Sequence, residues 1–153
     1  MSQVSDLVPC QVVLTVSDLA TSIAFYEQFG FQAGSRICKP DGRSRVTLTA
    51  RSSPGFELKL FTNPHAHANP ELPELADYLC RVGTRYLSLR CEDIDKFYEH
   101  FKGKLTFVRE PKNGLTGCRY AFVVDPDGIL LEIYQPNYWS QVQSSNNKTS
   151  RDD

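Results

Sequence analysis

The sequence lacks an excess of charge of either sign. Its 17 lysines and arginines are balanced by 18 aspartates and glutamates, and the formal net charge at pH 7 is −1. Proteins that bind nucleic acid or anionic membranes usually carry a basic excess, because both partners are densely negative. The balanced composition therefore argues against nucleic acid and against a membrane surface as partners.

Long apolar runs are absent too. No stretch approaches the roughly 20 apolar residues that span a bilayer. The first ten residues, MSQVSDLVPC, lack the basic end and the long apolar run of a signal peptide. The five cysteines are odd in number and show no CxxC spacing, which favours reduced thiols. We therefore expect a soluble, globular protein of the cytoplasm.

Two common catalytic arrangements are missing. The sequence contains no Ser-His-Asp pattern and no glycine-rich phosphate loop. Of the three histidines, His65 and His67 form a His-Ala-His string in a proline-rich segment. There an exposed loop pair is favoured over a metal-binding pair. His100 falls on a predicted helix and is interpreted as a surface residue.

What the sequence does contain is an internal repeat. The string AFYEQFGF at residues 24–31 is similar to KFYEHFKG at residues 96–103. Each follows a strand-like alternation of apolar and polar residues. Ser17 or Asp18 can cap the first helix, and Glu92 or Asp93 lies at the start of the second. The aromatic residues of both strings fit a buried helical stripe, so we interpret them as packing residues.

Each predicted helix is followed by strands with strong turn signals between them. KPDG and SSPG separate the strands of the first half, and PKNG and DPDG those of the second. The halves keep a common offset of 75 residues, which relates Gln11 to Tyr86 and Glu57 to Glu132. The pattern predicts two copies of a βαβββ unit.

The repeat predicts how the chain is divided. We expect the first module at residues 1–61 and the second at residues 84–138. A linker at residues 62–83 joins them, and a polar, disordered tail follows at residues 139–153. Prolines exclude a helix from the start of the linker, while ELADYLC favours a short helix near its end. Whether the linker covers a binding site stays open.

Two motifs resemble a known family. LTVSDLATSIAFYEQFGF in the first half and VVDPDGILLEIYQP in the second are similar to motifs of the vicinal oxygen chelate superfamily. That superfamily includes glyoxalases, extradiol dioxygenases, fosfomycin- and bleomycin-resistance proteins, and methylmalonyl-CoA epimerases. The resemblance implies an α+β fold of two tandem βαβββ modules that form a curved, cup-shaped mixed sheet with helices on the convex side. It also implies a homodimer.

The resemblance further implies an active site in the concave face. The positions carried over are Gln11, Glu57, Tyr86 and Glu132, and each falls on the face of its strand opposite the strongly apolar one. Glyoxalase-type sites use glutamine or histidine, glutamate, histidine or glutamine, and glutamate. Gln11, Glu57 and Glu132 therefore fit as metal ligands. Tyr86 departs from the pattern, because a phenol ligates a metal well mainly as phenolate.

This departure leaves a metal-bound and a metal-free site open. Oxygen ligands with added waters favour a hard cation such as Mg²⁺ or Mn²⁺, and Ni²⁺ or Zn²⁺ is the alternative. Extradiol dioxygenase chemistry needs two histidines and a carboxylate, and no histidine falls on this face, so we do not expect it. Solvent-exposed polar residues are the competing interpretation for Gln11, Glu57 and Tyr86. Glu132 has apolar and aromatic neighbours on its face, where an unpaired carboxylate is costly.

Two functions follow from the resemblance. The first is a glyoxalase-like enzyme, an isomerase, lyase or cyclising enzyme that acts on a small oxygenated molecule by proton transfer next to a carbonyl. Glu132 or Glu57 would be the general base, and Tyr86 would donate to the developing oxyanion. The second is a small-molecule binding protein of the bleomycin-resistance type, which sequesters its ligand without turnover.

The remaining candidates are predicted to bind the substrate or ligand. Lys59 and Arg90 can attract a carboxylate or an enolate, and they can equally form ion pairs with the neighbouring glutamates. Tyr134 can supply an aromatic wall. The expected partner is thus a small molecule.

Overall fold

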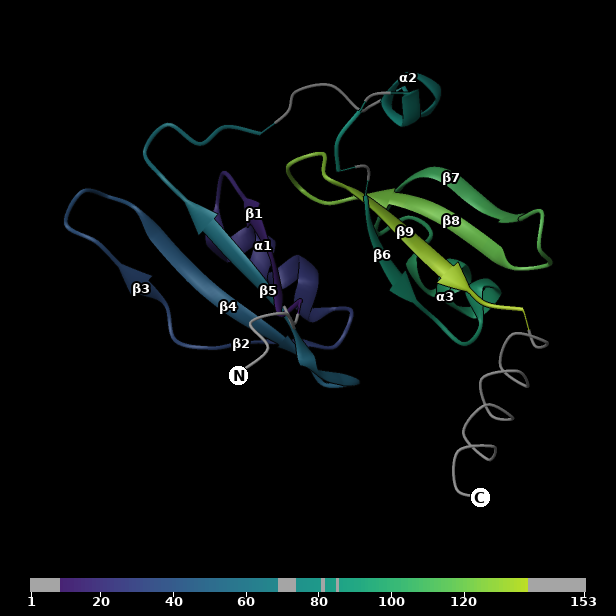
Figure 1. Cartoon of the computed structure of the whole chain (residues 1–153), viewed down its shortest axis with the longest axis horizontal. Helices are drawn as coiled ribbons and strands as arrows, with labels where there is room; N and C mark the ends of the chain where they lie inside the picture. The colour runs from purple at the N-terminus through teal and green to yellow at the C-terminus, as the bar shows by residue number, and fades with distance from the viewer. Residues whose placement is uncertain (1–8, 69–73, 81, 85, 138–153) are drawn as a thin grey trace, which may run out of the picture. The chain divides into compact units, whose positions relative to one another are not determined.

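The computed structural model describes residues 9–68, 74–80, 82–84 and 86–137. The chain forms two compact units, Met1–Asn69 and Pro70–Asp153, which we call unit 1 and unit 2. Each unit has its own sheet (Figure 1). No helix in the described ranges is long and apolar enough to cross a membrane. The predicted tail at residues 139–153 lies outside the described residues.

Unit 1 consists of one helix and a five-stranded mixed sheet. Its elements are β1 (Gln11–Thr15), α1 (Leu19–Glu27), β2 (Phe31–Ala33), β3 (Ile37–Cys38), β4 (Ser44–Ala50) and β5 (Ser53–Thr62). The strand order is β1-β5-β4-β2, and the short β3 pairs with β4. β1 runs parallel to β5, whereas β4 is antiparallel to both β2 and β5.

Unit 2 repeats this topology in a four-stranded mixed sheet. Its elements are α2 (Leu75–Cys80), β6 (Leu87–Arg90), α3 (Ile94–Phe101), β7 (Thr106–Asn113), β8 (Arg119–Val124) and β9 (Leu130–Gln135). The strand order is β6-β9-β8-β7, with β6 parallel to β9. The matching orders confirm the predicted pair of βαβββ modules, with the strands hydrogen-bonded into one sheet per unit.

An aspartate begins the main helix of each unit. Asp18 Oδ1 accepts a hydrogen bond from the Thr21 N–H at 2.7 Å, and Asp93 Oδ1 accepts one from the Lys96 N–H at 3.0 Å. These bonds satisfy N–H groups that have no partner within the helix. They also lower the pKa of both carboxyl groups. Of the two candidates at each helix start, the caps are therefore Asp18 and Asp93.

The aromatic string of unit 1 packs in the core, whereas Phe97, Tyr98 and Phe101 of unit 2 are half-buried. In unit 1, Phe25 and Tyr26 of α1 are buried with their rings edge to face at 5.1 Å. α1 contacts β4 and β5, where Leu48, Leu58 and Leu60 are fully buried. Aromatic and aliphatic side chains thus share one apolar layer between the helix and the sheet.

The DPDG motif forms the tight connection between β8 and β9. Asp125 Oδ1 accepts hydrogen bonds from the N–H groups of Asp127 and Ile129 at 2.9 and 2.8 Å. Gly128 has φ of 81°, a backbone conformation that glycine adopts without steric cost. The turn fixes where β9 begins and therefore where the side chain of Glu132 lies.

Candidate functional site

Each sheet has one face that packs against the main helix of its unit and an opposite face, which we call the mixed face. In unit 1 the mixed face is exposed or half-buried along β1 and β5. Because side chains alternate along a strand, it carries Gln11, Val13 and Thr15 from β1 and Glu57, Lys59 and Phe61 from β5. In unit 2 it carries Ser88, Arg90, Tyr120, Phe122, Val124, Leu130, Glu132 and Tyr134.

Two of the predicted site residues are neighbours in unit 1. Gln11 of β1 pairs in register with Glu57 of β5, so their side chains lie side by side on the mixed face. Lys59 lies in the next row, between Val13 of β1 and Thr47 of β4. The predicted ion pair of Lys59 with Glu57 is not found among the ion pairs of the described residues.

Glu132 has a defined partner in unit 2. Ser88 of β6 pairs with it in register, and Ser88 Oγ donates a hydrogen bond of 2.7 Å to Glu132 Oε2. On its other side Glu132 is paired with Phe122 of β8, which is only 4% exposed. One carboxylate oxygen is therefore satisfied by a hydroxyl, while the strand on the other side places an apolar ring next to the carboxylate.

Tyr86 lies against the same ring. The ring centroids of Tyr86 and Phe122 are 5.2 Å apart in an edge-on arrangement. Tyr86 packs with Tyr78 and Leu79 of α2 on a buried apolar cluster formed by Leu75, Phe122, Val124 and Leu130. Helix α2, from the predicted linker, thus packs on the mixed face of unit 2 and covers part of it.

The strand register corrects one expectation from the sequence. In unit 1, the N–H of Val16 donates a hydrogen bond to Phe61 O, and Val16 lies two residues before the cap Asp18. In unit 2, the N–H of Cys91 donates a hydrogen bond to Tyr134 O, and Cys91 likewise lies two residues before the cap Asp93. Phe61 is therefore equivalent to Tyr134, an offset of 73 residues. The predicted equivalence of Glu57 with Glu132 is wrong, since Lys59 occupies in β5 the place of Glu132 in β9.

The cause lies in the connections before these last strands. Thr49 of β4 pairs with Glu57, and a bulge follows between Thr49 and Ala50, whereas the equivalent Val124 of β8 pairs with Leu130 without a bulge. The first connection therefore contains two more residues than the second. A shift of two residues keeps every side chain on its face, so the alternation pattern could not reveal it.

The side chains at the four predicted positions match a glyoxalase-type metal site in part. Gln11 and Glu57, which are paired in unit 1, and Glu132 of unit 2 offer amide and carboxylate oxygens, whereas the phenol of Tyr86 replaces an imidazole or amide. Lys59, which matches Glu132 in the strand register, has no lone pair for a cation while it is protonated. Among the described residues no group of three or more His, Cys, Asp or Glu side chains is arranged to hold a metal.

The remaining predicted residues are Arg90 and Tyr134 on the mixed face of unit 2 and the three histidines. Arg90 is exposed and pairs in register with Tyr134, and no ion pair with Glu132 occurs within the described ranges. Burial, and then the neighbouring Cys118, raises the pKa of the Tyr134 hydroxyl. His65, His67 and His100 are all exposed.

Sequence reasoning missed two features of the mixed faces. Ser88 is not among the predicted site residues, although its position two residues after Tyr86 puts both on the same face. The basic residues Arg43 and Arg45 are not among them either, because an alternating pattern does not indicate which polar residues line a pocket. Together with Lys59 they form part of a pocket described below.

Comparison with known proteins agrees with this fold. Residues 10–133 match the family model described as the Glyoxalase/Bleomycin resistance protein/Dioxygenase superfamily, and the chain belongs to that superfamily. It is 31% identical over 130 residues to "Uncharacterized protein YwkD" of Bacillus subtilis, a match that covers 81% of this chain and 93% of that protein.

Two solved structures share the fold. A glyoxalase family protein from Bacillus cereus superposes with a TM-score of 0.70 at 17% identity, covering 88% of this chain and 97% of that one. The trypanothione-dependent glyoxalase I of Leishmania major gives 0.64 at 22% identity, covering 92% and 94%. At these identities the likeness concerns the fold.

Proposed function

We propose that this chain is a glyoxalase-like enzyme, an isomerase, lyase or cyclising enzyme that moves a proton next to a carbonyl of a small oxygenated molecule. Glu132 is the general base. The observation that carries the proposal is the position of its carboxylate, half-buried on the mixed face, bonded to Ser88 and next to Phe122. A carboxylate that is held in a fixed orientation beside an apolar ring is suited to take a proton from carbon.

Tyr86 is proposed to donate a hydrogen bond to the oxygen on which negative charge develops. Its ring is held against Phe122, on the same face as Glu132. A donor that is already in position stabilises an oxyanion without reorganising. Glu57, beside Gln11 in unit 1, is the alternative base, and Lys59, Arg90 and Tyr134 are the proposed substrate-binding residues.

A divalent metal, where one is bound, would polarise the substrate oxygens, and the roles of Glu132 and Tyr86 do not depend on it. The ligand set Gln11, Glu57 and Glu132 remains a prediction, supported by the adjacency of Gln11 and Glu57. Their amide and carboxylate oxygens are donors that hard divalent cations accept.

The second candidate function is a binding protein without turnover. The observation that favours it is the aromatic wall on the mixed face of unit 2, where Tyr86 and Tyr120 contact Phe122 at ring distances of 5.2 and 5.7 Å. Pockets for small molecules are typically lined by such apolar and aromatic side chains.

Hydrogen exchange at carbon separates the two functions. The purified protein is incubated in D₂O with a panel of small 2-oxo acids and 2-hydroxy carbonyl compounds, and loss of the proton next to the carbonyl is followed by NMR. The enzyme is expected to exchange at least one compound, and Glu132→Gln is expected to stop the exchange. Tyr86→Phe, which keeps the ring, is expected to slow it by about 100-fold.

Ligand affinity gives the complementary result. If panel members bind but none exchanges, and if Glu132→Gln and Tyr86→Phe leave the affinity unchanged, the enzyme is excluded and the binding function stands. If exchange persists in Glu132→Gln but is lost in Glu57→Gln, the base is Glu57.

The proposal includes a homodimer in the cytoplasm, as the family resemblance implies. Val13 on the mixed face of unit 1 is 56% exposed, and a second copy would remove its apolar surface from water. Light scattering on the purified chain is expected to give the mass of two chains. The mass of one chain at all concentrations would exclude the dimer.

A further inference from the structure

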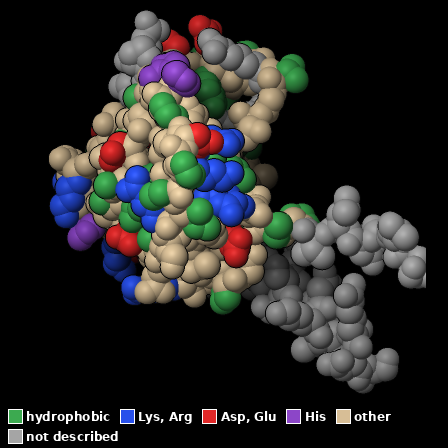
Figure 2. All heavy atoms as spheres, turned by 90° about the vertical axis from the view of Figure 1, so that its left-hand side faces the viewer, with side chains coloured by type: hydrophobic (Ala, Val, Ile, Leu, Met, Phe, Trp, Pro, Cys, Tyr) green, Lys and Arg blue, Asp and Glu red, His purple; other side chains and the backbone are tan. Residues whose placement is uncertain are grey.

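A pocket in unit 1 has a lining rich in positive charge. It has a volume of about 170 Å³ and lies over β3, β4 and β5. Four basic side chains line it, namely Lys39, Arg43, Arg45 and Lys59. Figure 2 views the molecule from the side on which β3 lies in Figure 1, and Lys and Arg side chains gather there among hydrophobic ones.

Only one of the four basic groups has an acidic partner in the described part of the chain. Arg43 Nε donates a 2.7 Å hydrogen bond to Asp41 Oδ2, and this contact lowers the pKa of the Asp41 carboxyl. No ion pair is found there for Lys39, Arg45 or Lys59. The pocket therefore keeps a net positive charge.

The strand register brings two of these charges together. Arg45 of β4 pairs with Phe61, and the next residue of β4 on the same face, Thr47, pairs with Lys59. Arg45 and Lys59 are thus diagonal neighbours, a relation that spans about 7–8 Å between backbones and lies within reach of long side chains. Like charges in such pairs repel, and a bound anion would relieve the repulsion.

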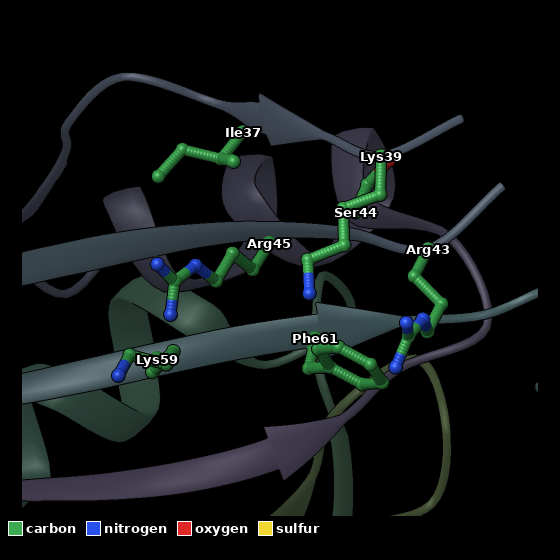
Figure 3. Close-up of a pocket in the computed structure, with 7 residues that line it drawn as sticks. All are labelled: Ile37, Lys39, Arg43, Ser44, Arg45, Lys59 and Phe61. Carbon is green, nitrogen blue, oxygen red and sulfur yellow. The ribbon is translucent and has the colours of Figure 1, made fainter. Parts of the chain in front are cut away.

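The pocket also offers apolar surface and a hydroxyl. Figure 3 shows the nitrogen-bearing ends of the basic side chains on the same side of β4 and β5 as the ring of Phe61. Ile37 and the 7% exposed Ser44 complete the lining. A volume of about 170 Å³ is below the roughly 300–1,000 Å³ of sites for drug-sized ligands. It suits an acidic group with a short carbon body.

We infer that this pocket binds a small organic anion, whose carboxylate or phosphate oxygens contact Arg45 and Lys59 and whose apolar part lies against Phe61. The guanidinium group can hold two oxygens of either anion at once, while the ammonium group acts as a point charge. The inference deepens the proposed function by naming the chemical class of the substrate. Binding of the anion is independent of the proposed function, and only the statement that the anion is the substrate rests on it.

Titration calorimetry at low salt tests the pocket. The probes are inorganic phosphate, a small aromatic carboxylate, the phosphate ester with the same ring, and the neutral amide of the carboxylate. At least one of the anions is expected to bind one per chain, at least tenfold tighter than the amide. The two organic anions separate carboxylate from phosphate as the preferred group.

Substitutions locate the binding. Lys59→Met and Arg45→Gln are each expected to weaken the anion about tenfold or more, the usual effect of losing a hydrogen bond between charged groups. Arg45→Lys is expected to bind the anion more tightly than Arg45→Gln, since it keeps the positive charge but cannot hold two oxygens at once. Lys112→Gln on the exposed part of β7 is the matched control and is expected to leave the affinity unchanged.

The inference is overturned if no anion binds better than the amide, or if Lys112→Gln weakens binding as much as Lys59→Met does. Its failure can be told from failure of the proposed function. Anion binding that Lys59→Met weakens, together with no hydrogen exchange on any panel compound, overturns only the enzyme. Exchange on neutral carbonyl compounds with no anion binding overturns only the pocket.

Discussion

The hydroxyl of Ser88 donates a 2.7 Å hydrogen bond to one carboxylate oxygen of Glu132, across the parallel pair of β6 and β9. The bond holds the carboxylate in one orientation on the mixed face. Ser88 is therefore a positioning residue for the proposed base, although it takes no part in proton transfer itself.

Removing the Ser88 hydroxyl is expected to impair proton transfer without unfolding the protein. We predict that Ser88→Ala lowers kcat for hydrogen exchange about tenfold with little change in KM, because the carboxylate loses its fixed orientation while the substrate-binding residues stay in place. Ser88→Thr keeps a hydroxyl and is expected to restore kcat. An unchanged kcat in Ser88→Ala, or a loss confined to KM, would contradict the assigned role.

One substitution is expected to strengthen the predicted metal site. Tyr86→His adds an imidazole to Gln11, Glu57 and Glu132, so that the four positions hold the side chains that glyoxalase-type sites use. After dialysis against Mn²⁺ or Ni²⁺ we predict about one metal ion per chain for this variant by elemental analysis. We predict less metal for the natural sequence.

The control is Tyr86→His combined with Glu57→Gln, because it keeps the added imidazole and removes one predicted carboxylate ligand. It is expected to lose the metal. A metal content in Tyr86→His no higher than in the natural sequence would contradict the expectation.

The packing of α2 on unit 2 depends on Leu75. This side chain is 7% exposed within the cluster of Phe122, Val124 and Leu130, and truncation of a buried leucine costs about 2–5 kcal/mol. We predict a loss near the lower end of that range for Leu75→Ala in urea unfolding, with faster hydrogen exchange of the α2 amides. Leu115→Ala, at a position 107% exposed, is expected to change neither.

The cap of α3 gives stability a pH dependence. Hydrogen bonds from the Lys96 and Asp95 N–H groups lower the pKa of Asp93 below its ordinary value, so the carboxylate stabilises the folded state at a pH above that ordinary value. The contribution is lost as the pH falls through the lower, folded-state pKa. Asp93→Asn keeps a capping side chain and is expected to flatten the urea midpoint as a function of pH below about 5. The exposed neighbour offers a control, Glu92→Gln, and an equal flattening there would contradict the assignment.

The cysteines are expected to differ in reactivity. Burial raises the pKa of the Cys91 thiol, and the thiolate is the reactive form. We predict that iodoacetamide at pH 8 alkylates Cys91 much more slowly than the exposed Cys10, Cys38 and Cys80, as followed by mass spectrometry. In urea the rates are expected to converge. Equal rates in the folded protein would show that Cys91 is accessible.

The topology could be predicted from the sequence because its signals are local. Turn motifs, alternating strands and the capping aspartates each act within a few residues, and the repeat ties them together. The same alternation placed Gln11, Glu57, Tyr86 and Glu132 on the mixed faces. What it could not provide was the neighbour of each residue on the next strand, since that depends on pairing between distant segments.

The register shows where this limit fell. Lys59 rather than Glu57 matches Glu132, because the connection before β5 is two residues longer and its bulge cannot be read from composition. The hydrogen bond from Ser88 and the charged pocket also depend on which strands pair. Each brings together residues more than ten positions apart in the sequence, and the periodicity of a single strand does not indicate such contacts.

The two-residue shift between β5 and β9 has a consequence for how duplicated proteins diverge. A strand that slides by an odd number of residues turns its apolar side chains toward water, and the fold is lost. A strand that slides by an even number keeps its core and exchanges only the residue that stands at a given place. One copy could thus place a basic residue where the other copy has an acidic one, at little cost in stability. Lengthening a hairpin by two residues is therefore a route to new chemistry in this architecture.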